Sequence, residues 1–188
     1  DLPTPFRCVA VDLLSGEQVV LKDGSLAKAM RATMSIPSAF SPFEWDDYLL
    51  VDGLVLNNYP VDVVKNMGAD IVIGLNLTTG KKDKTDFENL LTVFDRMLDI
   101  PTSARLKENI EMTDIYISQD MSGFSTSDFS STKTDGIIQR GRDAGSNNNP
   151  VLLALREQLE KYKDYKDWVQ QGNRKKKEEI ITINDNYI

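Results

Sequence analysis

The stretch LLVDGLVLNNYPVD, residues 49–62, places a short apolar run directly before an acidic residue, and the rest of the domain can be read outward from it. Residues 49–51 have the composition of a buried strand, which ends at Asp52. In α/β sheets, ligands and catalytic groups gather outside the carboxyl ends of strands, so Asp52 stands where a site residue is expected. Gly53 then permits either a positive φ or the close approach of another backbone segment.

The second half of the stretch is typical of a tight turn. Asn57 and Asn58 have side chains that can hydrogen-bond loop backbone, and Pro60 restricts the chain that follows. We expect these three residues and Gly53 to support the position of Asp52. A plain loop turn at Asp52-Gly53, with no role in chemistry, fits the same pattern, and the pattern alone leaves both interpretations open.

Composition narrows the function classes. The chain has 188 residues, enough for one sizeable domain with its own core. Its 22 Lys and Arg residues are outnumbered by 29 Asp and Glu residues, so no general attraction to nucleic acid is expected. The sequence contains no histidine, so this chain supplies neither the base of a Ser-His-Asp or Cys-His site nor a histidine-based metal site. Any catalysis by its own residues must use carboxylate, lysine or tyrosine side chains.

The residues before the stretch predict two hairpins and a helix. Two β-rich runs, residues 6–13 and 17–22, are separated by a loop of turn-forming composition. A second short hairpin, built around Asp46-Asp47, leads the chain to Asp52. Between the hairpins, Ser25 is placed to cap a helix that ends at Ile36-Pro37. The apolar positions of this helix follow helical spacing: Leu26, Ala27, Met30 and Met34.

The residues after the stretch predict alternating helices and strands. A short helix ends at Gly68, and residues 70–77, DIVIGLNL, are nearly continuous in apolar residues, which is typical of a parallel strand covered on both faces. A helix that begins near Phe87 is interrupted by Pro101. Leu106 and Ile110 can continue its pattern up to the strand DIYIS, residues 114–118. This order predicts an α/β layered domain.

The last third of the chain predicts a loop, two helices and a linker. A Ser- and Thr-rich loop at residues 121–134 precedes a short helix around Gly141. Asn149-Pro150 opens a final helix that closes at Gly172, with four inward-facing residues: Leu152, Leu155, Leu159 and Tyr162. Residues 173–179 have the composition of a solvated charged linker, and residues 180–188 alternate like the first strand of a following domain. We expect the chain to be part of a longer polypeptide.

Residues 5–77 resemble the second half of the bacterial patatin-like phospholipase domain. The matching features are a strand that ends in an Asp-Leu turn, a helix that runs into Ser35-Ile36-Pro37, the pair Asp52-Gly53, Asn58 two residues before Pro60, and Met67-Gly68-Ala69-Asp70. Weaker similarity continues to about residue 170. The resemblance implies that residues 1–172 are the C-terminal portion of a patatin-like acyl hydrolase domain and that residues 173–188 are a linker and the start of a following domain.

The resemblance implies a specific chemistry and fold. Patatin-like proteins are serine acyl hydrolases that use a Ser-Asp dyad, and Asp52 corresponds to the dyad's aspartate. The implied fold is a three-layer α/β domain with a central, mostly parallel sheet flanked by helices. The implied substrate is a lipid or another acyl ester, and the reaction requires no metal or organic cofactor. The resemblance does not decide where the protein is located: the bacterial cell envelope, the outer membrane and secretion as part of a larger protein all fit it.

Two departures from the family pattern bear on activity. Leu54 follows the Asp-Gly pair where the family has a small residue, and no Gly-x-Ser-x-Gly motif occurs in the 188 residues. We therefore expect this chain alone to be inactive, and to associate either with the missing N-terminal half of the domain or with itself. Two rival hypotheses remain: a non-catalytic lipid- or partner-binding module on the same scaffold, and a structural connector.

Overall fold

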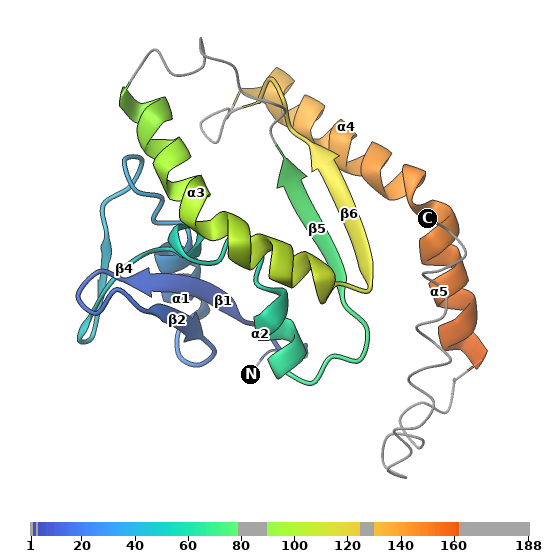
Figure 1. Ribbon diagram of the computed structural model, residues 1–188, viewed down its shortest axis with the longest axis horizontal. Coiled ribbons are helices and arrows are strands. Elements are labelled where there is room, and N and C mark those ends of the chain that lie inside the picture. The colour runs from blue at the N-terminus through green and yellow to red at the C-terminus, as the bar shows by residue number, and fades with distance from the viewer. Residues whose placement is uncertain (1, 3, 79–89, 125–129, 162–188) are drawn as a thin grey trace. The chain divides into compact units, whose positions relative to one another are not determined.

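The computed structural model describes residues 2, 4–78, 90–124 and 130–161. They form two compact units: the first contains the described part of residues 1–68 and 82–112, and the second that of residues 69–81 and 113–188. Each unit is built around its own sheet (Figure 1). The α/β class predicted from the order of helices and strands is confirmed.

The first unit contains a four-stranded antiparallel sheet in the order β2-β1-β4-β3 (Figure 1). Its strands are β1 Cys8–Asp12, β2 Gln18–Leu21, β3 Phe43–Trp45 and β4 Tyr48–Asp52. Both predicted hairpins are confirmed, and their short loops can join only antiparallel strands. The central pair of strands brings Ala10 opposite Asp52, so the candidate residue belongs to the middle of this sheet rather than to its edge.

Side-chain chemistry closes the turns of both hairpins. The Asp12 carboxylate accepts hydrogen bonds from the backbone N–H groups of Leu49 and Ser15, each at 3.0 Å. These bonds, that from Leu49 foremost, lower the pKa of Asp12. Asp46 has a φ of 53°, in the left-handed region that Asp tolerates better than most residues. The two acidic residues at 46 and 47 are therefore turn residues.

Helix α1, Leu26–Thr33, packs on this sheet through its small residues. Ser25 caps it as predicted, accepting a hydrogen bond from the Lys28 N–H at 3.4 Å. Ala32 is buried and forms a core cluster with Ala10 and Leu50. Alanines allow the helix to approach the sheet closely, so the longer apolar side chains of the same segment lie outside this contact. Three of these longer side chains are exposed: Leu26, Met30 and Met34.

From Asp52 the chain passes through a 3-10 turn, η1 Gly53–Val55, into helix α2 Val61–Asn66. The predicted stop of α2 is confirmed, since Gly68 has a φ of 89° just beyond it. Helix α3, Leu90–Glu111, completes the first unit and runs through Pro101 without a break. The predicted interruption at Pro101 is therefore wrong.

The reason for the continuous helix lies in its tertiary contacts. A proline inside a helix costs about 3 kcal/mol because it removes a hydrogen bond and crowds the preceding turn. Most helix stability in proteins comes from packing and tertiary contacts. The part of α3 beyond Pro101 is bound to the rest of its unit: Arg105 donates a hydrogen bond to Asp62, and Asn109 donates one to the carbonyl of Tyr59. These contacts hold the part of α3 that follows the proline against the rest of the unit.

The second unit contains a parallel pair of strands with helices after it. Strand β5 Ile73–Thr78 pairs with β6 Ile115–Asp120, with Ile73 opposite Ile115. Helices α4 Ser131–Asn147 and α5 Asn149–Lys161 follow. The core of this unit is one cluster of buried residues: Ile115, Ile117, Ala144 and Leu155. Helix α4 is longer than the short helix predicted, because it begins inside the predicted loop at residues 121–134.

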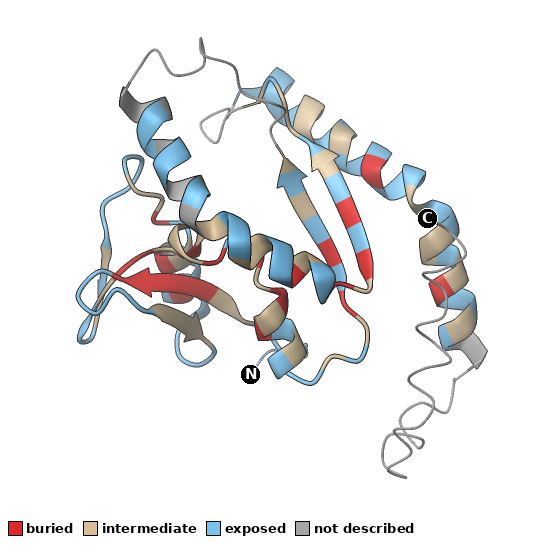
Figure 2. Ribbon diagram, in the orientation of Figure 1, coloured by how far each residue is buried: buried red, intermediate tan, exposed pale blue. Residues whose placement is uncertain are grey.

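Strand β5 differs from the prediction that both of its faces are covered. Ile73, Leu75 and Leu77 are 50, 54 and 61% exposed, and together they form the row that we call the β5 row (Figure 2). Parallel partners point to the same face, so the β5 row shares its face with Ile115 and Ile117, which the α4 and α5 cluster buries. Among the described strands, β5 pairs only with β6. The helices thus cover the β6 half of this face and leave the β5 half open.

The final helix follows the prediction at its start. It begins at Asn149, as predicted, and Leu155 is buried in the core cluster. Leu159, predicted to face inward, is exposed. The predicted helix end at Gly172, the linker at residues 173–179 and the strand at residues 180–188 lie outside the described residues.

The predicted central sheet is present only in part. The one parallel pair among the described strands is β5 with β6, and the strands around Asp52 are antiparallel. The two hairpin loops already require antiparallel pairing, because parallel strands need a crossover connection of a dozen or more residues. A mixed architecture, with an antiparallel sheet before the parallel pair, follows from those loop lengths.

Candidate functional site

Asp52 is held at the end of β4 by the backbone on both sides of it. Its N–H donates a hydrogen bond to the carbonyl of Ser35 at 3.0 Å, and it lies opposite Ala10 of β1. Ser35, two residues beyond the end of helix α1, is fully buried. The backbone position of Asp52 is therefore fixed by the sheet and by the segment that follows α1.

The two oxygens of the Asp52 carboxylate have different surroundings. Oδ1 accepts a hydrogen bond from the Leu54 N–H at 2.9 Å. Oδ2 accepts none from any residue that the structure describes. Burial raises the pKa of Asp52, and the Leu54 hydrogen bond opposes that effect. One oxygen thus orients the carboxylate, and the other remains available to accept a proton from a further group.

Gly53 is required by close packing. A Cβ at this position would lie 2.7 Å from the carbonyl oxygen of Val9, closer than real Cβ contacts come. Gly53 is buried and is not among the glycines with positive φ. Of the two reasons the sequence offers for a glycine here, the structure supports the close approach of another backbone segment.

Leu54 enters the site through its backbone. Its N–H binds Asp52, and its side chain is half-buried. A larger side chain than the family pattern has at this position is therefore compatible with the hydrogen bond that orients Asp52.

The two asparagines of the turn have different surroundings. Asn57 is buried, at 3% exposure, and its side-chain NH₂ donates to Asp62 at 2.9 Å and to Gln18 at 3.1 Å. Its own N–H donates to the carbonyl of Gly53 at 2.7 Å. Asn58 is exposed, and its side chain makes no hydrogen bond with the described part of the chain. Pro60 is half-buried directly before α2. Asn57, rather than Asn58, connects the turn to its surroundings.

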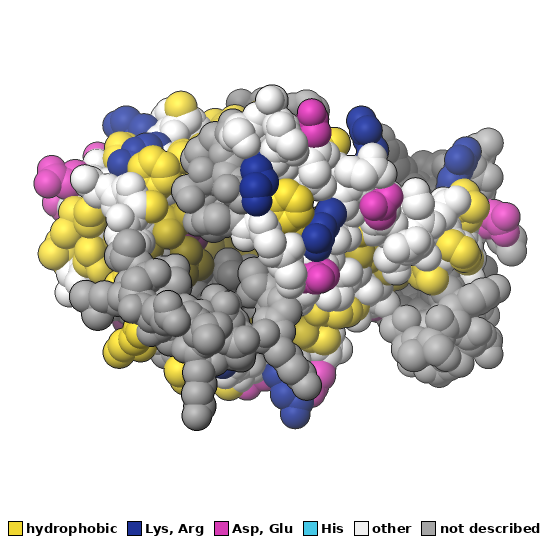
Figure 3. All heavy atoms as spheres, turned by 90° about the horizontal axis from the view of Figure 1, so that it is seen from above, with side chains coloured by type: hydrophobic (Ala, Val, Ile, Leu, Met, Phe, Trp, Pro, Cys, Tyr) yellow, Lys and Arg dark blue, Asp and Glu magenta, His cyan; other side chains and the backbone are white. Residues whose placement is uncertain are grey.

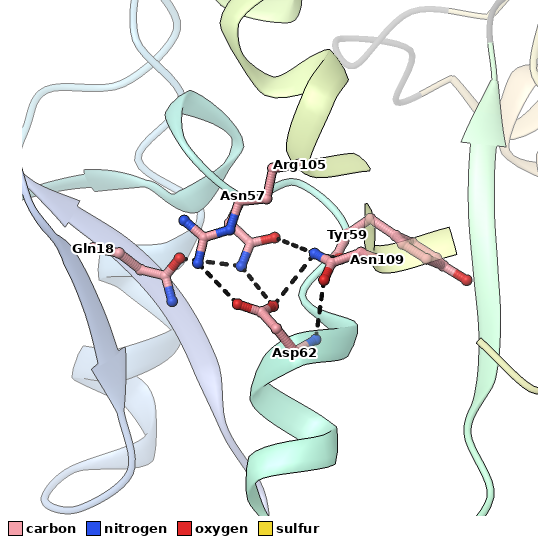
Figure 4. A network of polar contacts seen from close by, with 6 residues as sticks. All are labelled: Gln18, Asn57, Tyr59, Asp62, Arg105 and Asn109. Carbon is pink, nitrogen blue, oxygen red and sulfur yellow. Dashed lines mark hydrogen bonds and ion pairs between the residues drawn. The ribbon is translucent and has the colours of Figure 1, made fainter. Parts of the chain in front are cut away.

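Asn109 of α3 completes a polar network behind the turn, which Figure 4 shows from close by. Its side-chain NH₂ donates to the carbonyl of Tyr59 at 2.7 Å and to Asn57 Oδ1 at 3.1 Å. Its own Oδ1 accepts from the N–H of Asp62 at 3.2 Å. Asn109 is 1% exposed, so a single buried amide bridges the two sides of Pro60.

Asp62 carries the negative charge of the network. Burial disfavours that charge, but hydrogen bonds from Arg105 and Asn57 and the charge of Arg105 outweigh burial, so the pKa of Asp62 is lowered. Arg105 Nη2 lies 2.8 Å from Asp62 Oδ2. Asp62 is therefore paired with a positive charge, whereas Asp52 has no such partner among the described residues.

Neither Asn109 nor Arg105 is identified by the sequence as a site residue. They stand four residues apart on α3, on one face of the helix. For Asn109, the available signal is a polar residue of low helix propensity inside a helical segment, which is typical of many exposed positions as well. Their role depends on partners more than 40 positions away in the chain.

The described surface offers little else that points to a ligand. No helix among the described residues is long and apolar enough to cross a bilayer. In the same part of the chain, no group of acidic and cysteine side chains could hold a metal ion. Figure 3 shows hydrophobic side chains at the surface of one face, interspersed with both positive and negative side chains.

Comparison with known proteins finds similarity that includes Asp52 and the turn after it, residues 52–57, which we call the Asp52 turn. Residues 6–65 match the family model for patatin-like phospholipase. The chain is 37% identical over 91 residues to the mouse patatin-like phospholipase domain-containing protein 7. It is 40% identical over 76 residues to an uncharacterized NTE family protein of Mycobacterium tuberculosis. It is 38% identical over 88 residues to the human patatin-like phospholipase domain-containing protein 6.

These matches cover part of each protein. The match to the mouse protein spans 47% of this chain and 7% of that protein. The match to the mycobacterial protein spans 40% of this chain and 21% of that protein. The match to the human protein spans 46% of this chain and 6% of that protein. The chain therefore matches only a small part of the length of these relatives. The family match includes both Asp52 and the turn that holds it. Over residues 6–65, this chain is therefore similar to the patatin-like phospholipase family.

Proposed function

We propose that this chain supplies the aspartate of a Ser-Asp dyad in a patatin-like acyl hydrolase that cleaves acyl esters of lipids. The observation that carries the proposal is the asymmetry of the Asp52 carboxylate: Oδ1 is held by the Leu54 N–H, and Oδ2 accepts no hydrogen bond from the described residues. The match of residues 6–65 to the patatin-like phospholipase family model and the absence of histidine from the 188 residues support the same proposal.

In the proposed mechanism, Asp52 Oδ2 accepts the proton of a serine hydroxyl while the serine oxygen attacks the ester carbonyl carbon. The proton then passes to the leaving alcohol as the ester bond breaks, which leaves an acyl-serine. Water attacks that acyl group, gives a proton to Asp52 and releases the fatty acid, and the proton returns to the serine. Partial burial suits this role because it raises the pKa of Asp52 and so strengthens it as a base.

The nucleophile in this proposal comes from outside the present sequence, which has no Gly-x-Ser-x-Gly motif. The backbone N–H donors that stabilise the oxyanion come from the same source. We therefore expect no ester hydrolysis by this chain alone.

We further propose that the segment carrying the serine extends the β5–β6 pair into the central sheet of a three-layer domain. The exposed β5 row, together with the pairing of β5 with β6 alone among the described strands, supports this arrangement. Gel filtration tests this arrangement. The isolated chain is expected to self-associate or to bind the segment that carries the serine. A stable monomer that does not bind that segment would contradict the proposal.

The dyad is tested by fluorophosphonate labelling of the complete protein that contains this sequence together with its nucleophile segment. The probe reports an activated serine without requiring the true substrate. Asp52→Asn is expected to lower the labelling rate by at least about 10²-fold, the lower range for general-base catalysis. Asp47→Asn, which changes an exposed acid of the β3–β4 turn, is the matched control and should label like the unchanged protein. Equal labelling of both variants would contradict the role of Asp52 as the base, and no labelling of the folded, unchanged protein would favour the non-catalytic binding module.

A further inference from the structure

The Asp52 turn is restrained from two directions. On one side, Gly53 packs against the backbone of Val9, and the Asp52 N–H binds the carbonyl of Ser35. On the other side, the N–H groups of Leu56 and Asn57 both donate to the carbonyl of Gly53, at 3.1 and 2.7 Å. The position of Asn57 therefore bears directly on the peptide units that connect Gly53 to Leu54, whose N–H orients the carboxylate.

Asn57 is in turn held by a residue of another helix. Asn109 Nδ2 donates to Asn57 Oδ1 and to the carbonyl of Tyr59, two groups on the chain between the turn and α2 (Figure 4). The N–H of Asp62, the second residue of α2, donates to Asn109 Oδ1. Because Asn109 is almost fully buried, water cannot replace these bonds without opening the contact between α3 and the turn.

We propose that Asn109 is a positioning residue for Asp52: through Asn57 it fixes the turn that aims the carboxylate at the serine. The inference rests on the proposed function of Asp52. Asn109 lies outside residues 6–65, the segment that matches the family model, so the match itself assigns it no role. Arg105 supports the same arrangement indirectly. It forms an ion pair with Asp62, and Asp62 accepts a hydrogen bond from the Asn57 side chain.

A purely structural role for Asn109 makes a different prediction. Loss of a buried amide that only stabilises the fold reduces the number of folded molecules, and those that remain folded react at the normal rate. Loss of a positioning residue slows the reaction of every folded molecule, since a displacement of about 1 Å at a catalytic group costs about 10²-fold in rate. The labelled fraction and the labelling rate constant distinguish the two.

The test compares Asn109→Ala with Val61→Ala in the complete protein. Val61 is a buried residue of α2 whose truncation leaves a cavity and removes no side-chain hydrogen bond. For Asn109→Ala, the rate constant of fluorophosphonate labelling at saturating probe is expected to fall at least about tenfold, with unchanged affinity for the probe. For Val61→Ala, only the labelled fraction should fall. An unchanged rate constant in Asn109→Ala would overturn the proposal.

Hydrogen exchange gives a second reading that does not depend on activity. The Leu54 N–H, which donates to Asp52, is expected to exchange about tenfold faster in Asn109→Ala than in Val61→Ala at equal global stability. Equal exchange at Leu54 would overturn the proposal. If Asn109→Ala fails to fold, Arg105→Met replaces it, because the Arg105 side chain is 39% exposed and its loss is tolerated more easily. We expect a roughly threefold slower rate constant for Arg105→Met, weaker because it acts through Asp62, and an unchanged rate constant overturns the proposal.

Failure of this inference can be separated from failure of the proposed function by Asp52→Asn. If Asp52→Asn abolishes labelling and Asn109→Ala leaves the rate constant intact, Asp52 is the base and Asn109 does not position it. If Asp52→Asn labels normally, the proposed function itself is wrong, and the positioning role falls with it.

Discussion

The turn that follows Asp52 and the β5–β6 pair differ in how far the described residues satisfy their polar groups and cover their apolar side chains. Around Asp52, polar groups from three separate segments satisfy one another, and one carboxylate oxygen is left without a partner among the described residues. Around β5, the backbone pairs on one side only, and the apolar β5 row is exposed. The comparison teaches that contacts within the described first unit orient the Asp52 carboxylate, whereas the described residues of the second unit leave the β5 row uncovered.

The largest expected effect on stability comes from a substitution in the core of the first unit. Leu50 is fully buried beside Ala10 and Ala32, so Leu50→Ala should lower the free energy of unfolding of the first unit by about 2–5 kcal/mol. Urea unfolding followed by the fluorescence of Trp45, which packs on that cluster, measures it. A loss below about 1 kcal/mol would mean that this sheet and helix do not form the core that we describe.

The turn itself is broken by Asn57→Ala, with Asn58→Ala as the matched control. Asn57→Ala leaves buried partners without hydrogen bonds and should cost about 1–3 kcal/mol in the free energy of unfolding. Asn58 is exposed, so its change should stay within about 0.5 kcal/mol. Equal costs for the two variants would remove the distinction between the neighbouring asparagines.

The pH dependence of stability sharpens the contrast between two acids of the same unit. The pKa of Asp62 is lowered from 3.8, so its contribution to stability is present above that value and is lost as pH falls through the lowered pKa. Asp62→Asn should therefore destabilise the protein at neutral pH, and the difference should shrink in acid. Convergence of the two unfolding curves at low pH is the expected observation, and a constant gap would contradict it.

For Asp52, we expect ionisation to have the opposite effect on the free energy of unfolding. Its pKa is raised, so the ionised form costs stability at neutral pH, and that cost disappears as pH falls through the raised pKa. Asp52→Asn is expected to stabilise the protein at neutral pH and to have little effect in acid. Destabilisation by Asp52→Asn at neutral pH would show that the carboxylate is satisfied, rather than poised to accept a proton.

The smallest expected effect on folding concerns the β5 row. Leu75→Ser should change the free energy of unfolding of the isolated chain by no more than about 0.5 kcal/mol, because the side chain is already exposed. It should nevertheless weaken self-association, or binding of the proposed nucleophile segment, in gel filtration. Leu14→Ser, at an exposed position of the β1–β2 turn, is the control and should leave association unchanged. The interpretation of the β5 row is wrong if the two variants behave alike.

Local signals in the sequence predicted much of the fold. Turn residues located both hairpins, Ser25 located the start of α1, and Gly68 marked the end of α2. The apolar run at residues 70–77 indicated a parallel strand, and the structure pairs it in parallel with β6. Each of these features depends on residues that are close together in the chain.

What the sequence could not reveal depends on partners that are distant in the chain. Helical spacing found the apolar positions of α1, but Ala32 beside them is the residue of α1 that belongs to the core cluster of the sheet. The run of apolar residues in β5 could not say whether both faces are covered within this chain. Pro101 was expected to break a helix that tertiary contacts keep continuous. Asn109 was missed because its meaning comes from Asn57, 52 positions away.

The central claim is that the free oxygen of Asp52 faces the nucleophilic serine, and the most direct measurement is a crystal structure of the complete protein. We expect the serine Oγ to lie about 2.6–3.2 Å from Asp52 Oδ2, with Oδ1 still bound to the Leu54 N–H. A serine that is beyond hydrogen-bond reach of Asp52, or an Oδ2 bound instead to a structural partner, would contradict the account.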